Sequence, residues 1–133
     1  MTWVIERLLL IDGNASNLER WLTIEPAVQA ALECRQVLPA ATLRGIPPSE
    51  PGSWTLTPAR SFTVFGLPVA QVRLFIDPDG ELGASYTAVI EKRSLEQVHR
   101  QLEFAGNRGR IGQLSADRPG QHVELSCTVE SAR

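Results

Sequence analysis

The feature that most constrains the fold is a period-two alternation of apolar and polar residues in the second half of the chain. Such alternation is typical of strands that bury one face and expose the other. It occurs over Val72–Ile76, Tyr86–Ile90 and Val123–Val129. The first two segments are separated by the Asp-Pro-Asp-Gly sequence at 77–80, which is typical of a β-hairpin turn. The pattern therefore predicts an antiparallel sheet.

A helix is expected between the second and third of these strands. Ser94 and Gln97 have the spacing of a capping box, in which side chains satisfy free amides at a helix N-terminus. Apolar residues then recur every three or four positions, and Gly106 is a typical C-terminal stop. We predict a helix over 95–105, followed by a polar, glycine-rich loop over 107–120.

The N-terminal segment allows two interpretations. Residues 3–11 fit a helical spacing and, in part, a strand-like alternation, so helix and strand both stay open. The Asp-Gly-Asn sequence at 12–14 predicts a turn. A capping box at 16–19 then predicts the start of a helix.

The helix expected from Ser16 would bury Leu18, Trp21 and Leu22. Pro26 suits a first helical turn, where its missing amide costs nothing. It therefore predicts a second helix over 26–38, which would bury Val28, Ala31, Leu32 and Leu38.

Residues 39–60 predict a long irregular connection, because they hold five prolines and two glycines. A short strand over 54–56 is one option within it. Long loops in small domains are usually functional or disordered. Trp54 either holds this loop to the core or forms a contact surface, and we favour the first.

These elements predict a single α+β domain over residues 1–133, with an antiparallel sheet and two to three helices. If residues 3–11 form a strand, the element order fits a ferredoxin-like sandwich variant. If they form a helix, the order fits an antiparallel sheet with helices on one face.

Composition argues against several classes of protein. The net charge is −2, so no broad basic field is available to neutralise nucleic-acid phosphates. No run approaches the ~20 apolar residues that cross a bilayer, and no secretory leader pattern is evident. We therefore expect a soluble, cytoplasmic protein that does not insert into membranes. Cys34 and Cys127 belong to no Cys-x-x-Cys pair; we favour a buried thiol for Cys127 and leave their pairing open.

The sequence shows no recognisable catalytic motif, so enzyme activity is unsupported. His99 and His122 have no neighbours at metal-ligand spacing, and we expect no metal and no cofactor. The loop at 107–112 carries Arg108 and Arg110. We interpret this segment, in order of preference, as a solvated loop, as a protein-binding arginine pair or as a phosphate site.

Two short segments resemble fasciclin-like domains. The Phe-Thr-Val-Phe sequence at 62–65 resembles a strand of that family, and Gly-Gln-His-Val at 120–123 resembles its closing Gly-x-x-His-Val strand. The family's Ala-Pro-Thr-Asn continuation is replaced by Gly-Leu-Pro-Val at 66–69, and the two pieces lie closer together than in the family. The resemblance implies a fasciclin-like sandwich that acts as a non-catalytic docking module, of which a small accessory subunit of the cyanobacterial NDH-1 complex is an example.

We therefore predict a non-catalytic accessory subunit or adaptor that docks on a larger protein complex. The alternatives are a small enzyme or ligand-binding domain with a pocket between sheet and loop, a bacterial immunity or inhibitor protein, and a homo-oligomer paired through a sheet edge. Large apolar groups off the core face, such as Phe104, suggest a partner surface. The predicted partner-binding residues are Trp54, Phe65, Leu67, Phe104, Arg108 and Arg110.

Overall fold

The computed structural model describes the backbone of residues 2–106 and 110–130, and side chains from Asn17 onward. The elements in chain order are α1 (Thr2–Leu32), the 3₁₀ helix η1 (Ala40–Leu43), β1 (Ser53–Leu56), β2 (Thr63–Val64), β3 (Leu67–Ile76), β4 (Ala84–Ile90), α2 (Leu95–Ala105), β5 (Gln113–Asp117) and β6 (Val123–Val129). The predicted α+β class with an antiparallel sheet is confirmed.

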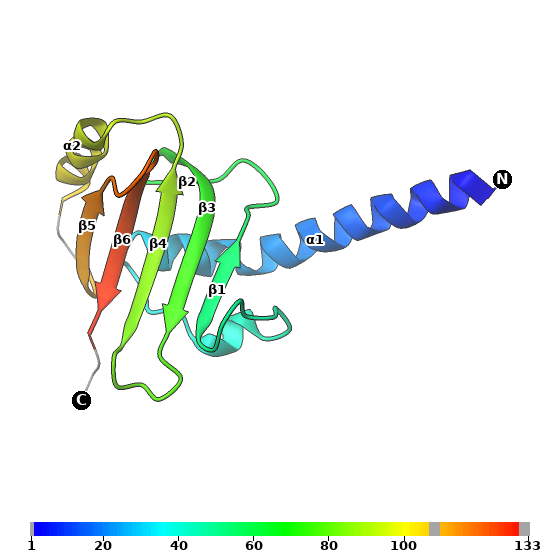
Figure 1. The fold of residues 1–133 in the computed structure, drawn as a ribbon, viewed down its shortest axis with the longest axis horizontal. Coiled ribbons are helices and arrows are strands. Elements are labelled where there is room, and N and C mark those ends of the chain that lie inside the picture. Colours follow the sequence, from blue (N-terminus) through cyan, green and yellow to red (C-terminus); the bar gives the residue numbers. More distant parts are fainter. Residues whose placement is uncertain (1, 107–109, 131–133) are drawn as a thin grey trace.

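The sheet forms a single antiparallel layer in the order β1-β3-β4-β6-β5, and β2 pairs with β3 at one end (Figure 1). β3 and β4 form the predicted hairpin, in which Leu74 lies opposite Tyr86. β5 is a correction, because it occupies part of the segment predicted as a loop. It is an edge strand paired only with β6, and its side chains are exposed or half-buried, so it lacks a strong apolar alternation.

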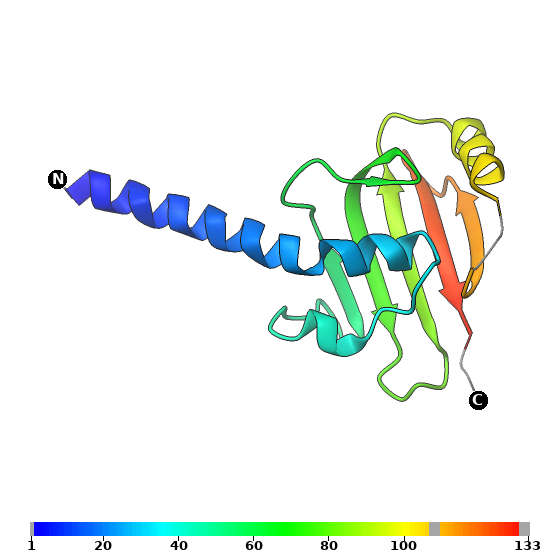
Figure 2. The ribbon, with the colours of Figure 1, turned by 180° about the vertical axis from the view of Figure 1, so that it is seen from behind.

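The N-terminal segment forms one helix of 31 residues, α1, which continues as far as Leu32. The predicted turn at 12–14, the helix start at Ser16 and the second start at Pro26 are therefore wrong, and no N-terminal strand completes a ferredoxin-like order. An internal proline removes one helical hydrogen bond, a cost that packing of the surrounding helix can offset. Figure 2 shows the C-terminal part of α1 lying across one face of the sheet.

The core lies between that part of α1 and the sheet. Predicted core residues Val28, Ala31, Leu32 and Leu38 are all buried. The sheet contributes Val72, Leu74, Tyr86, Ala88, Val123, Leu125 and Cys127. The opposite face carries mainly polar side chains such as Arg73, Thr87 and Ser126, as the alternation predicted, and Phe75 and Val89 also lie on it.

Two of the three expected core residues at the start of the helix are exposed. Trp21 is buried, whereas Leu18 is 36% and Leu22 39% exposed. Trp21 lies between them in the sequence and is buried, so Leu18 and Leu22 must lie on the side of α1 that faces away from the sheet. Figures 1 and 2 show that the N-terminal part of α1 also projects beyond the edge of the sheet. The prediction assumed that every apolar position on the helix faces the core.

A disulfide bond joins Cys34, just after α1, to Cys127 on β6, with the two Cα atoms 5.4 Å apart. Both residues are fully buried. The interpretation of Cys127 as a free buried thiol is therefore wrong. The bond ties the end of the long helix to a central strand.

The proline-rich segment 39–60 is more regular than predicted, because it contains η1 and the optional strand, β1. The Trp54 indole N–H donates to the carbonyl of Ile46 at 3.0 Å, which confirms that Trp54 holds this segment in place. Leu38 is fixed at the start of the segment, where its N–H donates to the Tyr86 hydroxyl at 3.0 Å.

Candidate functional site

Three of the predicted partner-binding residues lie at one corner of the fold. Leu67 is buried, and Phe65 and Arg110 are half-buried. The Arg110 guanidinium lies 5.1 Å from the Phe65 ring centroid and donates to the carbonyls of Glu33 and Gly106. These contacts are internal to the domain.

The backbone of Phe65 is held in the same corner. It has a φ of 54°, in the left-handed region that non-glycine residues rarely adopt. Its N–H donates to the Glu33 carboxylate and its carbonyl accepts from the Gln101 amide, both at 2.8 Å. This corner therefore links α1, α2 and the β2–β3 turn, and a partner-binding role for it stays a prediction.

Phe104 is 86% exposed on α2, in line with its position off the helical stripe. It borders a depression of about 400 Å³ that Arg93 and Arg100 also line. Arg100 pairs with Glu96 on the surface of the helix, a contact that water screens. Arg108 lies outside the described residues.

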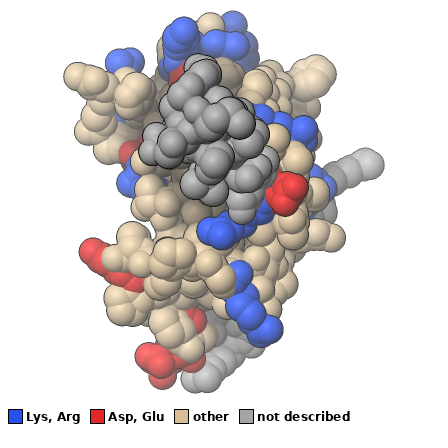
Figure 3. Space-filling model, turned by 90° about the vertical axis from the view of Figure 1, so that its right-hand side faces the viewer, with Lys and Arg blue, Asp and Glu red and all other residues tan. Residues whose placement is uncertain are grey.

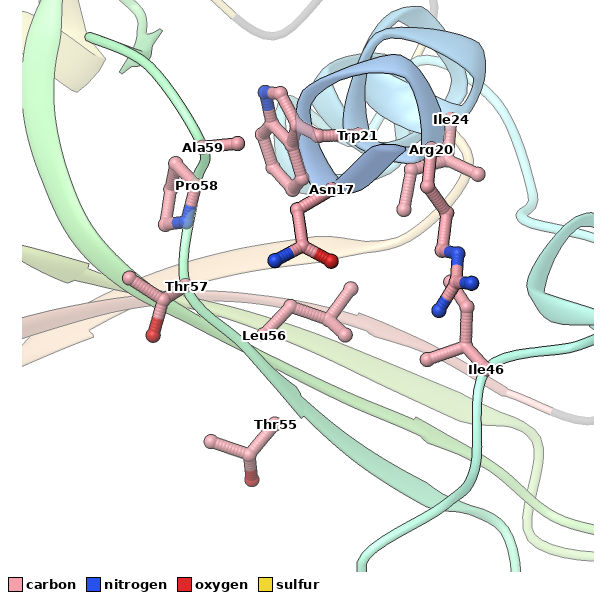
Figure 4. A pocket seen from close by; sticks show the side chains of 10 residues that line it. All are labelled: Asn17, Arg20, Trp21, Ile24, Ile46, Thr55, Leu56, Thr57, Pro58 and Ala59. Atoms are coloured by element: carbon pink, nitrogen blue, oxygen red, sulfur yellow. The ribbon is translucent and has the colours of Figure 1, made fainter. Parts of the chain in front are cut away.

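A larger groove, of about 500 Å³, lies under the part of α1 that reaches past the sheet. We call it the α1 groove, and it is lined by Asn17, Arg20, Trp21, Ile24, Ile46, Thr55, Leu56, Thr57, Pro58 and Ala59. Figure 4 shows Asn17 reaching from the helix toward Leu56 of β1, the Trp21 ring beside Ala59, and Arg20 on the side of Ile46. The floor is apolar, and the polar groups lie around it.

One wall of the α1 groove is fixed by an ion pair. Arg60 donates twice to the carboxylate of Glu25 on α1, at 2.6 and 3.0 Å, and the Trp21 indole N–H donates to the same carboxylate. The hydrogen bond from Arg60 is the main reason that the pKa of Glu25 lies below its usual value, against the opposing effect of burial. The Trp21 ring also meets Phe62 edge-on, with centroids 5.1 Å apart. The groove is therefore pre-formed, as binding sites usually are.

A free strand edge borders the same groove. The N–H of Ile76 donates to the carbonyl of Gly52 at 2.8 Å, so the alternation of an antiparallel ladder places the next hydrogen-bonded pairs at Trp54 and Leu56. The N–H and carbonyl of Thr55 must then point away from β3. Within the described part of the chain, neither group has a hydrogen-bond partner.

The two edges of the sheet differ in this respect. At the β1 edge, Ser53 is already bonded to Glu50 and Ser49, which leaves Thr55 as the open position. At the β5 edge, α2 packs alongside, and His99 Nε2 lies 3.2 Å from the carbonyl of Ala116. Both edges thus have exposed positions, and the β1 edge is the one that opens on the α1 groove.

The chemistry of the α1 groove favours binding. Among the described residues that line it, Arg20 is the only ionisable one, and neither His99 nor His122 is among them. Acid–base catalysis usually needs a residue that exchanges protons near neutral pH, which arginine does not. Among the described residues, no three His, Cys, Asp or Glu side chains form a group that could hold a metal ion.

Charge on the surface around α1 is mixed. Figure 3, which views the molecule from the side of the projecting helix, shows a group of basic side chains at the upper end, with further basic and acidic side chains scattered below it. Among the described residues visible in this view, no field of one sign forms. Among the described helices, none is long and apolar enough to cross a membrane.

Sequence reasoning predicted that Trp54 holds the segment 39–60 in place, but it did not predict the α1 groove. Trp21 was assigned to the core, and Arg20 and Leu56 carried no motif. The groove joins Trp21 of α1 to Leu56 of β1, which lies 35 positions further along the chain. No local pattern records such a meeting.

Comparisons with protein-family models, with curated proteins and with solved structures found no match to this chain. The resemblance to fasciclin-like domains therefore stays a prediction, and the argument about function rests on the groove and the strand edge.

Proposed function

We propose that this protein is a non-catalytic adaptor or accessory subunit that binds an extended segment of another protein in the α1 groove. The observation that carries the proposal is the open edge of β1 at Thr55, directly beside an apolar groove. Together they match β-strand addition, in which main-chain hydrogen bonds supply affinity and neighbouring pockets select side chains.

The features of the groove define the segment it would accept. The floor formed by Trp21, Ile24 and Leu56 suits a large apolar side chain. Arg20 on the rim suits an acidic residue nearby, because arginine binds carboxylates through directed, charge-assisted hydrogen bonds. The expected ligand is therefore an extended, acidic-apolar peptide segment.

Binding of a small molecule is the second candidate, because the volume of about 500 Å³ falls in the range of small-molecule sites. The open strand edge favours a peptide, since a small ligand leaves the outward groups of Thr55 unused. Enzyme activity has no comparable support in this groove.

A phage-displayed library of random linear peptides, selected on the full chain, tests the proposal. Selected peptides are expected to share an apolar anchor and an acidic residue. Thr55→Pro removes the outward N–H without removing a bond to β3, and edge strands tolerate proline. We expect it to weaken binding at least about tenfold, the effect of losing one well-made hydrogen bond.

Charge reversal gives a matched pair of variants: Arg20→Glu should weaken binding of the selected peptides, whereas Arg100→Glu, on the α2 surface, should leave it unchanged. Phe104→Ala, a second control on the α2 surface, should also leave binding unchanged. If the selected peptides fail to bind the α2 variants but still bind the groove variants, the α1 groove is not the binding site. A selection that returns no peptide would also refute the proposal. An unchanged amide NMR spectrum away from each mutated site would confirm the fold.

A cytoplasmic location stays a prediction, and the buried Cys34–Cys127 bond weighs against it. Disulfides persist mainly in oxidising compartments. Trapping free thiols in freshly lysed source cells decides between the two: an alkylated pair supports the cytoplasm, and an intact disulfide excludes it.

A further inference from the structure

Leu18 and Leu22 form an exposed apolar pair on α1. Five large apolar residues are exposed among the described side chains, and the other three, Val37, Leu82 and Phe104, lie on separate parts of the fold. Scattered apolar residues on a surface are ordinary. Leu18 and Leu22, however, lie one turn apart on the same face of α1. Together they form an exposed apolar patch that needs a further explanation.

The sequence upstream continues the same spacing. Val4, Leu8, Ile11, Ala15, Leu18 and Leu22 follow one another in alternating steps of four and three residues. This is the a/d spacing of a coiled coil, with Leu22 at an a position and Leu18 at a d position. The α1 backbone is helical from Thr2, so one continuous helix carries the whole series.

This apolar series, the α1 seam, is separate from the face of α1 that packs on the sheet. At 3.6 residues per turn, Leu18 and Leu22 lie roughly 100° around the helix from the buried Trp21, Ile24 and Val28. Figure 1 shows the N-terminal part of α1 standing clear of every other element. A second helix can therefore lie along the seam without displacing the sheet.

We infer that the projecting part of α1 pairs with the same segment of a second copy, as a parallel two-stranded coiled coil. The charges at the flanking positions select this occupant. Arg7 falls at a g position and Asp12 at the e position five residues later. A parallel homodimer sets these positions against each other across the seam, with opposite charges on both sides.

The antiparallel arrangement is less favourable. It sets e positions of one copy against e positions of the other, which gathers acidic Asp12 and Glu19 from both copies on one flank. The helix also needs a partner, because Gly13 lowers helix stability by about 1 kcal/mol and helices in proteins are stabilised mainly by packing of an apolar face. A second copy supplies the missing burial.

The inference is independent of the proposed peptide binding. Arg20 and Ile24 fall at f and c positions, away from the seam. Trp21 falls at a flanking g position, but its indole is directed toward Glu25 and Phe62, so both copies keep an open groove. A parallel dimer would present two grooves on the same side of a shared stalk and bind a repeated target with higher avidity.

Sedimentation velocity of the full chain over a range of concentrations tests the pairing. The wild type is expected to reach twice the monomer mass. Leu18→Glu/Leu22→Glu is expected to weaken the dimer at least about tenfold. Val37→Glu/Phe104→Glu, which adds the same charges at two exposed apolar positions elsewhere, should leave it intact.

Cysteine crosslinking tests the orientation. Leu8→Cys and Leu18→Cys, made separately, should each crosslink two copies, because a parallel seam places identical residues opposite each other. In an antiparallel pair, identical residues lie opposite each other only at the centre of the pair, so at most one of the two variants could crosslink. Val37→Cys, which lies outside the seam, should not crosslink. A wild type that stays monomeric, a dimer that survives the double glutamate variant, or crosslinking at only one or neither seam position overturns the inference.

Discussion

Removal of the Cys34–Cys127 disulfide should destabilise the domain strongly. The bond closes a loop with a sequence separation of 93 residues. In the loop-entropy model, a crosslink of that span removes about 4.6 kcal/mol of conformational entropy from the unfolded state. Native disulfides in small domains typically contribute about 2–5 kcal/mol, so we expect the Cys34→Ala/Cys127→Ala variant to lose about 3–5 kcal/mol of unfolding free energy.

For a domain of this size, that loss corresponds to a fall in the melting temperature of roughly 10–15 °C. The measurement is thermal unfolding followed by circular dichroism, for the wild type and the double alanine variant, each with and without a reductant. Reductant should lower the wild-type melting temperature to near that of the variant, and should leave the variant unchanged.

Two results would refute this reasoning. A loss of less than about 1 kcal/mol would mean that packing of α1 on the sheet already confines the chain as much as the crosslink does. Two free thiols in the folded, air-oxidised protein would mean that the bond does not form. Replacing both cysteines together avoids leaving a lone reactive thiol that would confuse either result.

Three further substitutions test other parts of the structure. Tyr86→Phe leaves the Leu38 N–H buried without its acceptor, and should cost about 1–3 kcal/mol in urea unfolding; no loss would show that water or another group replaces the hydroxyl. Glu25→Gln removes a carboxylate whose pKa is lowered in the folded state, so the stability it contributes is present above the unfolded pKa and is lost as the pH falls through the folded pKa. Unfolding free energy measured from pH 7 down through the range below about 4.5 should therefore fall less steeply in this variant, and parallel curves would refute the role of the Arg60 pair. Gly112→Ala places a Cβ against the carbonyl oxygen of Thr128, so it should destabilise the protein and raise amide exchange across β5, whereas Gly120→Ala, whose Cβ meets open space, should not affect this exchange.

The second half of the fold was predictable because the sequence signals that specify its elements act over short distances along the chain. The turn at 77–80 joins β3 to β4, and the Ser94–Gln97 capping box begins α2, with Gly106 at its end. Turn residues and caps act within a few positions of themselves, whatever the rest of the chain does. The alternation in β6 likewise records directly which side chains meet the core.

The first part of the fold misled the same reasoning. The turn sequence at 12–14, the capping box at 16–19 and Pro26 are all genuine helix-boundary signals, yet α1 continues through them. Turn and cap preferences are worth about 1 kcal/mol each, and a proline inside a helix costs about 3 kcal/mol. Burial of Trp21, Ile24, Val28 and Leu32 outweighs that cost at Pro26, because each fully buried large apolar side chain contributes about 1.5–3 kcal/mol. β5 was missed for the converse reason, since an exposed edge strand has little apolar pattern to detect.

The sequence by itself therefore determined the α+β class, the central hairpin, α2 and the polar outer face of the sheet, because each follows from short-range periodicity and turn chemistry. The tertiary structure decided which segments meet. It placed Thr55 at an open edge beside the α1 groove, joined Cys34 to Cys127, and left Leu18 and Leu22 exposed on a helix that extends past its own core. These features depend on contacts between residues far apart in the chain, and the free energy of such contacts is settled only when the sheet and α1 pack together.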